Sequence, residues 1–351
     1  MSRAVDDLRA AVGRIPQAVR ATSGRVDARA LARCLEGRGR LVIAASGNSA
    51  YPARYLEWLL DTTTTIDARV MTPLDYLLAP PHQPHCCLLV SQGARRRDGY
   101  SVMGAATRIG APFFVLCGDG ALEGRTIATE QPPGHVFPTA TLGEHAFLNI
   151  VGTGAAFAAA WELAAALGGA PRLRFPLPDW ATLEKATPPA LESTRSVLAL
   201  HGPAARCAAE AFTGYHCESL GPALAGDLKN FTHGVWRGLD ESGRASIYLV
   251  AERAVEPLGR YLHARLAAYH DSALVHAPGD LPRSVEPFAL FVIMLRAWIA
   301  RIARHAVQRG DDWSPLTIDK ARYAPLLELT RYDLDSLPPP QAMQDDWIGN
   351  A

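Results

Sequence analysis

The sequence has few of the features that mark secreted, membrane-bound or nucleic-acid-binding proteins. Its 351 residues include 35 Lys and Arg against 35 Asp and Glu, so no excess of one charge points to a nucleic acid or an anionic membrane. The amino-terminal residues lack the basic-then-apolar order of a signal peptide, and no apolar run reaches the roughly 20 residues that a membrane helix needs. These absences predict a cytoplasmic protein that binds neither nucleic acid nor membrane.

Cysteine is sparse and scattered, which excludes a disulfide scaffold and a zinc site of the usual spacing. The six cysteines are Cys34, Cys86, Cys87, Cys117, Cys207 and Cys217. They contain no CxxC pair, so we expect reduced and mostly buried thiols. His82 and His85 share a loop without neighbouring carboxylates, which favours a polar surface loop over a metal site.

The residues that are present indicate a soluble globular chain with two domains. Hydrophobic residues make up 48% and charged residues 20%, and the length suits two domains that each bury a core. A unit of apolar strand, polar turn and helix recurs along the chain. It occupies residues 41–60, then 86–110, and it restarts at residues 197–215 and 247–269. Strands that alternate with helices predict α/β domains, each with a parallel sheet covered on both faces.

The segments between these units, and the glycine and proline residues in them, predict the domain boundaries. Residues 1–36 show helical spacing, and residues 37–167 form the first predicted domain, closed by an alanine-rich helix over residues 144–167. Glycine and proline mark residues 168–192 as a linker. Residues 193–325 form the second domain, with a long last helix over 287–309, and residues 326–351 form a tail.

Two polar turns in the first domain predict an anion site. Gly47, Asn48 and Ser49 follow the first apolar strand, and Ser91, Gln92 and Gly93 follow another. In an open parallel sheet, ligands bind beyond the carboxyl ends of the strands, where helix amino termini present N–H groups. The alternative is that the Ser and Asn side chains only cap helices.

These turns resemble those of the SIS (sugar isomerase) domain family, which includes phosphosugar isomerases and the isomerase half of glucosamine-6-phosphate synthase. The family's first strand ends in a Gly-Thr-Ser-like turn, and its second in Ser-Gln-Ser-Gly-Glu-Thr, which begins here as Ser91-Gln92. Gly93, Ala94 and three arginines then replace the hydroxyl-bearing residues. Arg95 and Arg96 either supply phosphate contacts in their place or form a solvated basic turn, and both interpretations stay open.

The second half resembles the catalytic part of the same family. Residues 225–229, Ala-Gly-Asp-Leu-Lys, match the family's Ala-Gly-Glu-Leu-Lys run, and His233 follows after a short insertion. Glu218 falls within one position of the family's catalytic Glu. Residues 310–315 have the pattern Gly-x-x-x-x-Pro, and Lys320 follows Pro315 by five positions, which is the family's spacing between this proline and its lysine.

The resemblance implies two tandem flavodoxin-like SIS domains and an aldose–ketose isomerase of a sugar or sugar phosphate, or related enediol chemistry such as deamination or deglycation. It assigns proton transfer between C1 and C2 to Glu218, ring opening to His233 and charge stabilisation to Lys320, with no metal or organic cofactor. In the family the His-Gly loop reaches a neighbouring subunit, so a homodimer with a shared site is implied. The absence of a cysteine after Met1 predicts no glutamine-dependent amination. The alternative is a non-catalytic regulatory module that binds a sugar phosphate.

Overall fold

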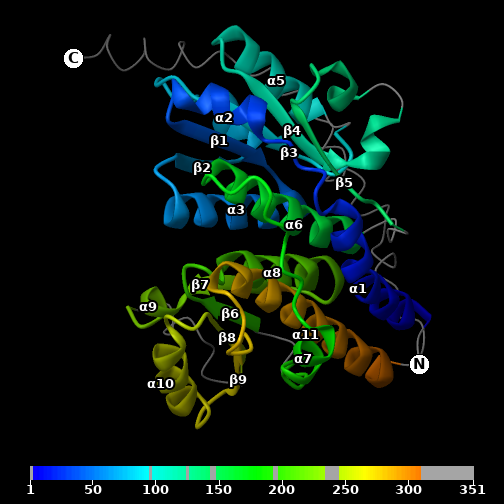
Figure 1. Cartoon of the computed structure of the whole chain (residues 1–351). Coiled ribbons are helices and arrows are strands. Elements are labelled where there is room, and N and C mark those ends of the chain that lie inside the picture. The colour runs from blue at the N-terminus through cyan, green and yellow to red at the C-terminus, as the bar shows by residue number, and fades with distance from the viewer. Residues whose placement is uncertain are drawn as a thin grey trace, which may run out of the picture. The chain divides into compact units, whose positions relative to one another are not determined.

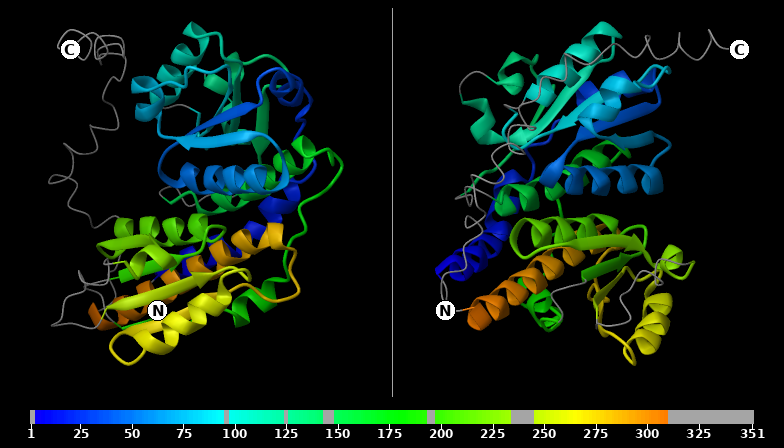
Figure 2. Two further views of the ribbon diagram at one scale, coloured as in Figure 1. Left: turned by 90° about the vertical axis from the view of Figure 1, so that its left-hand side faces the viewer. Right: turned by 180° about the vertical axis from the view of Figure 1, so that it is seen from behind.

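Two compact units make up the described part of the chain. The computed structural model describes residues 3–94, 97–123, 126–142, 148–192, 197–233 and 245–309. The first-sheet unit contains residues 21–141 and 158–174, and the second-sheet unit contains residues 3–20, 142–157 and 175–309. Figures 1 and 2 show one sheet in each unit. The boundary between the units passes through helices α1 (Arg3–Thr22) and α6 (Ile150–Leu167).

The first-sheet unit is built on five parallel strands in the order β2-β1-β3-β4-β5. The strands are β1 (Arg40–Ala45), β2 (Asp67–Met71), β3 (Cys86–Val90), β4 (Phe113–Gly118) and β5 (Val136–Thr139). The chain moves from β1 outward to β2 and then returns to place β3 on the other side of β1. The sheet therefore has a topological switch point between β1 and β3, the place where open α/β sheets bind ligands.

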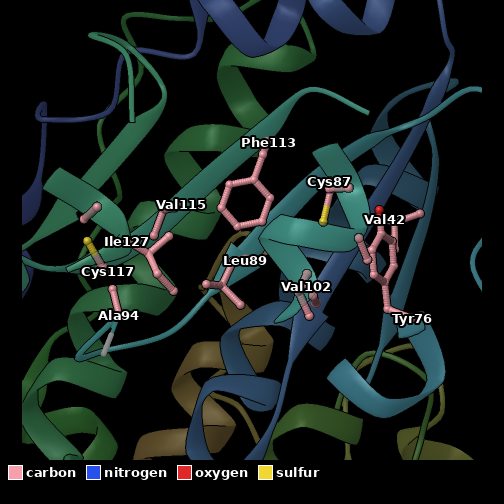
Figure 3. Close-up of a cluster of buried hydrophobic side chains, with 14 of the residues drawn as sticks. Val42, Tyr76, Cys87, Leu89, Ala94, Val102, Phe113, Val115, Cys117 and Ile127 are labelled. Carbon is pink, nitrogen blue, oxygen red and sulfur yellow. The ribbon is translucent and has the colours of Figure 1, made fainter. Parts of the chain in front are cut away.

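Helices pack on both faces of this sheet. Its helices are α2 (Arg29–Glu36), α3 (Ala50–Thr63), α4 (Pro73–Leu78) and α5 (Arg97–Arg108), with short 3-10 turns at Gly47–Ser49, Asp119–Leu122 and Ile127–Glu130. Tyr76 of α4 and Val102 of α5 join alternate strand residues such as Val42, Leu89 and Val115 in a buried cluster (Figure 3). Helix α3 contacts β1 and β2. Alternation along the strands thus gives each face its own core.

The second-sheet unit repeats the design with four parallel strands in the order β7-β6-β8-β9. The strands are β6 (Val197–His201), β7 (Ala223–Asp227), β8 (Ser246–Ala251) and β9 (Asp271–His276). The helices are α7 (Trp180–Lys185), α8 (Arg206–Ser219), α9 (Leu228–Phe231), α10 (Glu256–Leu266) and α11 (Glu286–Arg309), and a 3-10 turn at Arg283–Val285 precedes α11. Apolar residues of α9 and α10 pack on one face of the sheet, and α8 packs on α11.

Helix α6 is long and apolar enough to cross a membrane by composition alone. Of its apolar window, 78% is buried inside the protein, as is usual for a core helix. Phe157 in this helix stacks on Phe291 of α11 with ring centroids 4.5 Å apart. The apolar surface of α6 therefore packs against other parts of the protein.

The predicted fold class is confirmed, since both sheets are parallel and carry helices. The helix predicted from residue 144 is described from Ile150 onward. Strands β2, β5 and β9 were not predicted, because they are not continuously apolar and include partly exposed positions. Residues 225–229, which match a family loop, lie instead in β7 and the start of α9. The predicted domain boundaries stay a prediction.

A buried histidine holds the carboxyl end of α8 in place. Arg301 of α11 donates from Nε to Nε2 of His216 at 3.3 Å, so this imidazole nitrogen is an acceptor. Nδ1 therefore carries the proton and donates to the carbonyl of Gly221 at 2.9 Å. Desolvation by burial, with the nearby Arg301 charge, lowers the pKa of His216 to about 4. The folded protein thus holds this histidine neutral.

We predict that stability falls as the pH is lowered from 6.5 to 4. In that window the unfolded chain protonates His216 and the folded chain does not, which costs about 3 kcal/mol in total at about 1.36 kcal/mol per pKa unit. Denaturant midpoints of wild type and His216→Gln across this range measure the effect, and the variant should lose part of the slope. His276→Gln, which alters an exposed imidazole, is the control. Equal slopes in wild type and His216→Gln would contradict the prediction.

Candidate functional site

The structure brings the two predicted turns together at one edge of the first sheet. Strands β1 and β3 are neighbours and run parallel, with Ala45 paired to Val90 at their carboxyl ends. Ser46 and Ser91 are the next residues of the two strands. The turns 46–49 and 91–94 therefore emerge side by side at the topological switch point. Sequence reasoning placed both turns at strand ends, and the strand order makes them neighbours.

The turn after β1 leads into α3 without a side-chain cap. Gly47 has a φ of +54°, a left-handed conformation that favours glycine, and a Cβ added there would meet no atom within 4 Å. Neither Ser46 nor Ser49 accepts a capping hydrogen bond from the following turn. Other helices of the chain are capped, since Thr72 and Asp179 accept from backbone amides of α4 and α7. Ser46 and Ser49 therefore do not cap the helical turns that follow them.

The turn after β3 is fixed by the end of β4. Gly118 donates from its backbone N–H to the carbonyl of Gln92 at 3.0 Å, and Ile127 donates to the carbonyl of Ala94 at 3.2 Å. A Cβ on Gly118 would lie 2.5 Å from Thr141 and 3.1 Å from the Gln92 carbonyl oxygen, so only glycine allows this approach. Gly93, by contrast, is exposed and has no atom within 4 Å of an added Cβ.

Ala94 adopts a conformation that its side chain disfavours. Its φ is +44°, and the residue is fully buried. A non-glycine residue in this region costs about 1 kcal/mol or more, and such strain gathers at functional turns. Ala94 stands where the resembled family has glycine, so the turn keeps the backbone shape without the residue that adopts it most easily. Arg95 and Arg96 follow it and lie outside the described residues.

The equivalent position in the second sheet is filled by the protein itself. Glu252, directly after β8, accepts hydrogen bonds from the backbone N–H groups of Ala204 and Ala205 at 3.3 Å each. A Cβ on Gly202 would lie 2.4 Å from a carboxylate oxygen of Glu252, so glycine is required there. Burial, reinforced by the charge of Glu286, raises the pKa of Glu252. The backbone N–H groups just before α8 are therefore already bonded to a carboxyl group of the protein.

Glu218 lies near the carboxyl end of α8, one residue before Ser219. Trp298 of α11 donates from Nε1 to the Ser219 hydroxyl at 2.8 Å, and His216 is held by Arg301. These contacts fix the backbone on either side of Glu218. Its residue is exposed, yet desolvation by the surrounding chain raises the pKa of its carboxyl. A carboxylate of raised pKa on a rigid helix end is suited to accept and return a proton.

Of the other two predicted catalytic residues, the structure describes His233, and it does not lie next to Glu218 within the second-sheet unit. His233 follows α9 beyond the carboxyl end of β7 and is exposed. Helix α8 runs back from the carboxyl edge of the sheet, so Glu218 precedes the amino end of β7. The five residues of β7 separate these two ends by about 16 Å at roughly 3.3 Å per residue. Lys320 lies outside the described residues.

Sequence reasoning missed Glu252 and Gly118. Glu252 directly follows the apolar strand β8, and Gly118 is the last residue of the apolar strand β4. A charged residue or a glycine at the carboxyl end of a parallel strand was a usable signal for each. Their partners, Gly202 and Thr141, are distant in sequence, so the contacts themselves were not readable.

No family model matches the sequence, and a search of curated proteins finds no significant match. Solved structures do show a likeness. A proposed phosphosugar isomerase from Silicibacter pomeroyi DSS-3 matches with a TM-score of 0.62 and 19% identity, over 90% of this chain and 100% of that one. Tagatose-6-phosphate ketose/aldose isomerase from Escherichia coli matches with a TM-score of 0.59 and 14% identity, over 89% and 97%.

A third solved structure is also similar to this chain. The C-terminal domain of glucosamine-fructose-6-phosphate aminotransferase from Francisella tularensis matches with a TM-score of 0.59 and 12% identity, over 87% of this chain and 96% of that one. At these identities the likeness shows the fold alone. The chain therefore has the SIS-type fold, with two tandem α/β units that are each built on a parallel sheet.

Proposed function

We propose that the chain is an isomerase of a sugar or sugar phosphate, acting by aldose–ketose or related enediol chemistry. The observation that carries the proposal is the pair of neighbouring turns at the switch point of the first sheet, the β1 turn uncapped and rich in hydroxyl, amide and glycine residues. The likeness to a tagatose-6-phosphate isomerase and to other sugar-phosphate proteins supports this ligand class. We further propose that the protein acts in the cytoplasm.

The ligand's polar or anionic group would bind at the turns of the first sheet. Gly47, Asn48 and Ser49 on one side and Ser91, Gln92 and Gly93 on the other would offer backbone N–H groups, hydroxyls and amides to its oxygens. Arg95 and Arg96 would add guanidinium contacts if the group is a phosphate. In the second sheet, Glu252 already accepts hydrogen bonds from the N–H groups before α8. This supports the assignment of anion binding to the first sheet.

Glu218 would move the proton between C1 and C2. The carboxyl needs a pKa near the working pH to accept a proton from carbon and return it, and its raised pKa supports this role. His233 would open the sugar ring and Lys320 would stabilise the negative charge of the enediolate. These roles come from the family resemblance, residue by residue.

A homodimer would supply the missing neighbour of Glu218. Within one chain, β7 separates Glu218 from His233. In a two-fold symmetric dimer, Glu218 of one chain would lie near the partner's His233. The symmetry would then form two such shared sites. A regulatory module that binds a sugar phosphate without turning it over remains the competing function, and catalysis separates the two.

We predict that Glu218→Gln removes turnover and leaves most of the binding. The amide keeps the shape of the side chain and loses its basicity, so the rate should fall by about 100-fold or more. The measurement is incorporation of solvent deuterium at C1 or C2 of those free or phosphorylated aldoses and ketoses that raise the melting temperature. Glu256→Gln, on α10, is the matched control and should keep the wild-type rate. If wild type exchanges no carbon-bound proton with any sugar that it binds, the isomerase proposal fails.

We predict that Gly93→Ser strengthens binding of a phosphorylated sugar. An added Cβ meets no atom within 4 Å, so the serine fits and returns a hydroxyl that the resembled turn has. One hydrogen bond of about 1 kcal/mol corresponds to roughly fivefold in the dissociation constant. Gly93→Ala adds the Cβ without the hydroxyl and should leave affinity unchanged in calorimetric titrations. Equal affinities of the Ser and Ala variants would show that the ligand's anion does not bind beside residue 93.

A further inference from the structure

A groove of about 330 Å³ lies between α1, α7 and α11 of the second-sheet unit and has no part in the proposed reaction. Its lining includes Arg9, Val12 and Gly13 of α1, Glu184 of α7, and Arg296 and Ile299 of α11. Figures 1 and 2 show α1 and α7 beside the same stretch of α11. We call it the three-helix groove. Its volume falls within the range of about 300–1,000 Å³ that is usual for small-molecule sites.

The floor of the groove is kept open by a glycine inside a helix. Gly13 lies in the middle of α1, where glycine is less favourable than alanine. A Cβ added at this position would meet no atom within 4 Å, so no described neighbour requires the glycine. A helix backbone without a side chain at this point lets a ligand approach closely.

Arg296 supplies hydrogen-bond donors to the groove. Its guanidinium lies 5.5 Å from the ring of Trp180, and its side chain is 19% exposed. Nη1 is 3.4 Å from a carboxylate oxygen of Glu184, which is longer than a close charge-assisted hydrogen bond, and Glu184 is 69% exposed. Within the described part of the chain, Nε of Arg296 is buried and has no hydrogen-bond partner. The guanidinium is therefore packed beside Trp180, and Glu184 makes only a long contact with one of its nitrogens.

The charge and polarity of the lining select the ligand class. Arg9 and Arg296 line the groove with one carboxylate, Glu184. Arg9 is already paired with Asp6 at 3.4 Å, so Arg296, whose Nε has no partner among the described residues, is the cation that favours an anionic ligand. Val12 and Ile299 provide apolar wall next to Gly13. We propose that the three-helix groove binds a small organic carboxylate, with its carboxylate on the Arg296 fork and its apolar body against Val12 and Ile299. This site is independent of the isomerase proposal.

Benzoate is a direct probe, because it joins one carboxylate to an apolar ring. Titration of the full chain with benzoate, followed by amide NMR shifts of α1 and α11, should give a dissociation constant of about millimolar size for so small a ligand. Benzamide keeps the shape without the charge and should bind about tenfold more weakly. Equal binding of the two probes, no binding of benzoate at roughly ten times that concentration, or full displacement by inorganic phosphate would overturn the proposal.

Variants of the groove locate the binding. Arg296→Gln should weaken benzoate by about tenfold, and Gly13→Leu should abolish binding because its side chain fills the groove. Gly13→Ala should retain binding, and Arg260→Gln, on α10, should match wild type. Circular dichroism melting confirms that each variant is folded. Benzoate binding that survives Gly13→Leu in a folded protein would place the ligand elsewhere and overturn the proposal.

Discussion

The parallel pairing of β1 with β3 is the constraint on which the candidate site depends. It fixes Ala45 beside Val90, so the two polar turns that follow must emerge at the same edge. Helix α5, which follows β3, packs in the same buried cluster as α4, whereas α3, which follows β1, lies on the other face, so the two helices leave this edge open between them. Gly118 then allows the close approach that holds the second turn against β4. Strand order alone therefore makes the two turns neighbours.

In the second sheet, a side chain of the protein itself bonds to the backbone N–H groups at the equivalent strand end. Glu252 brings a carboxylate to the amides of Ala204 and Ala205, at the position where a ligand anion would otherwise bind. The unit then contributes in another way, through a rigid α8 whose carboxyl end is fixed by His216, Arg301 and Trp298. The two units thus share a fold, and the proposed function assigns ligand recognition to the first and proton transfer to the second.

Periodicity and turn chemistry were sufficient to predict the fold class and both turns of the first sheet. Strands such as residues 41–45 are continuously apolar because both of their faces are buried, and this is visible in the sequence. Strand β7 was not visible, because Leu224 and Ala225 are exposed at a sheet edge and the segment reads as a loop. The role of Glu252 could not be predicted either, because it depends on contacts with Ala204 and Ala205, which are distant from it in the sequence.

The central claim is that the first sheet, and not the second, receives the ligand's anion. Amide NMR of the chain titrated with a hexitol 6-phosphate tests it directly, because this compound carries a phosphate and cannot isomerise. The account predicts shifts at Gly47, Ser49 and Gly93, and none at Ala204 and Ala205, whose N–H groups are already bonded to Glu252. Shifts at Ala204 and Ala205 with unchanged signals at residues 47–49 and 91–93 would contradict it.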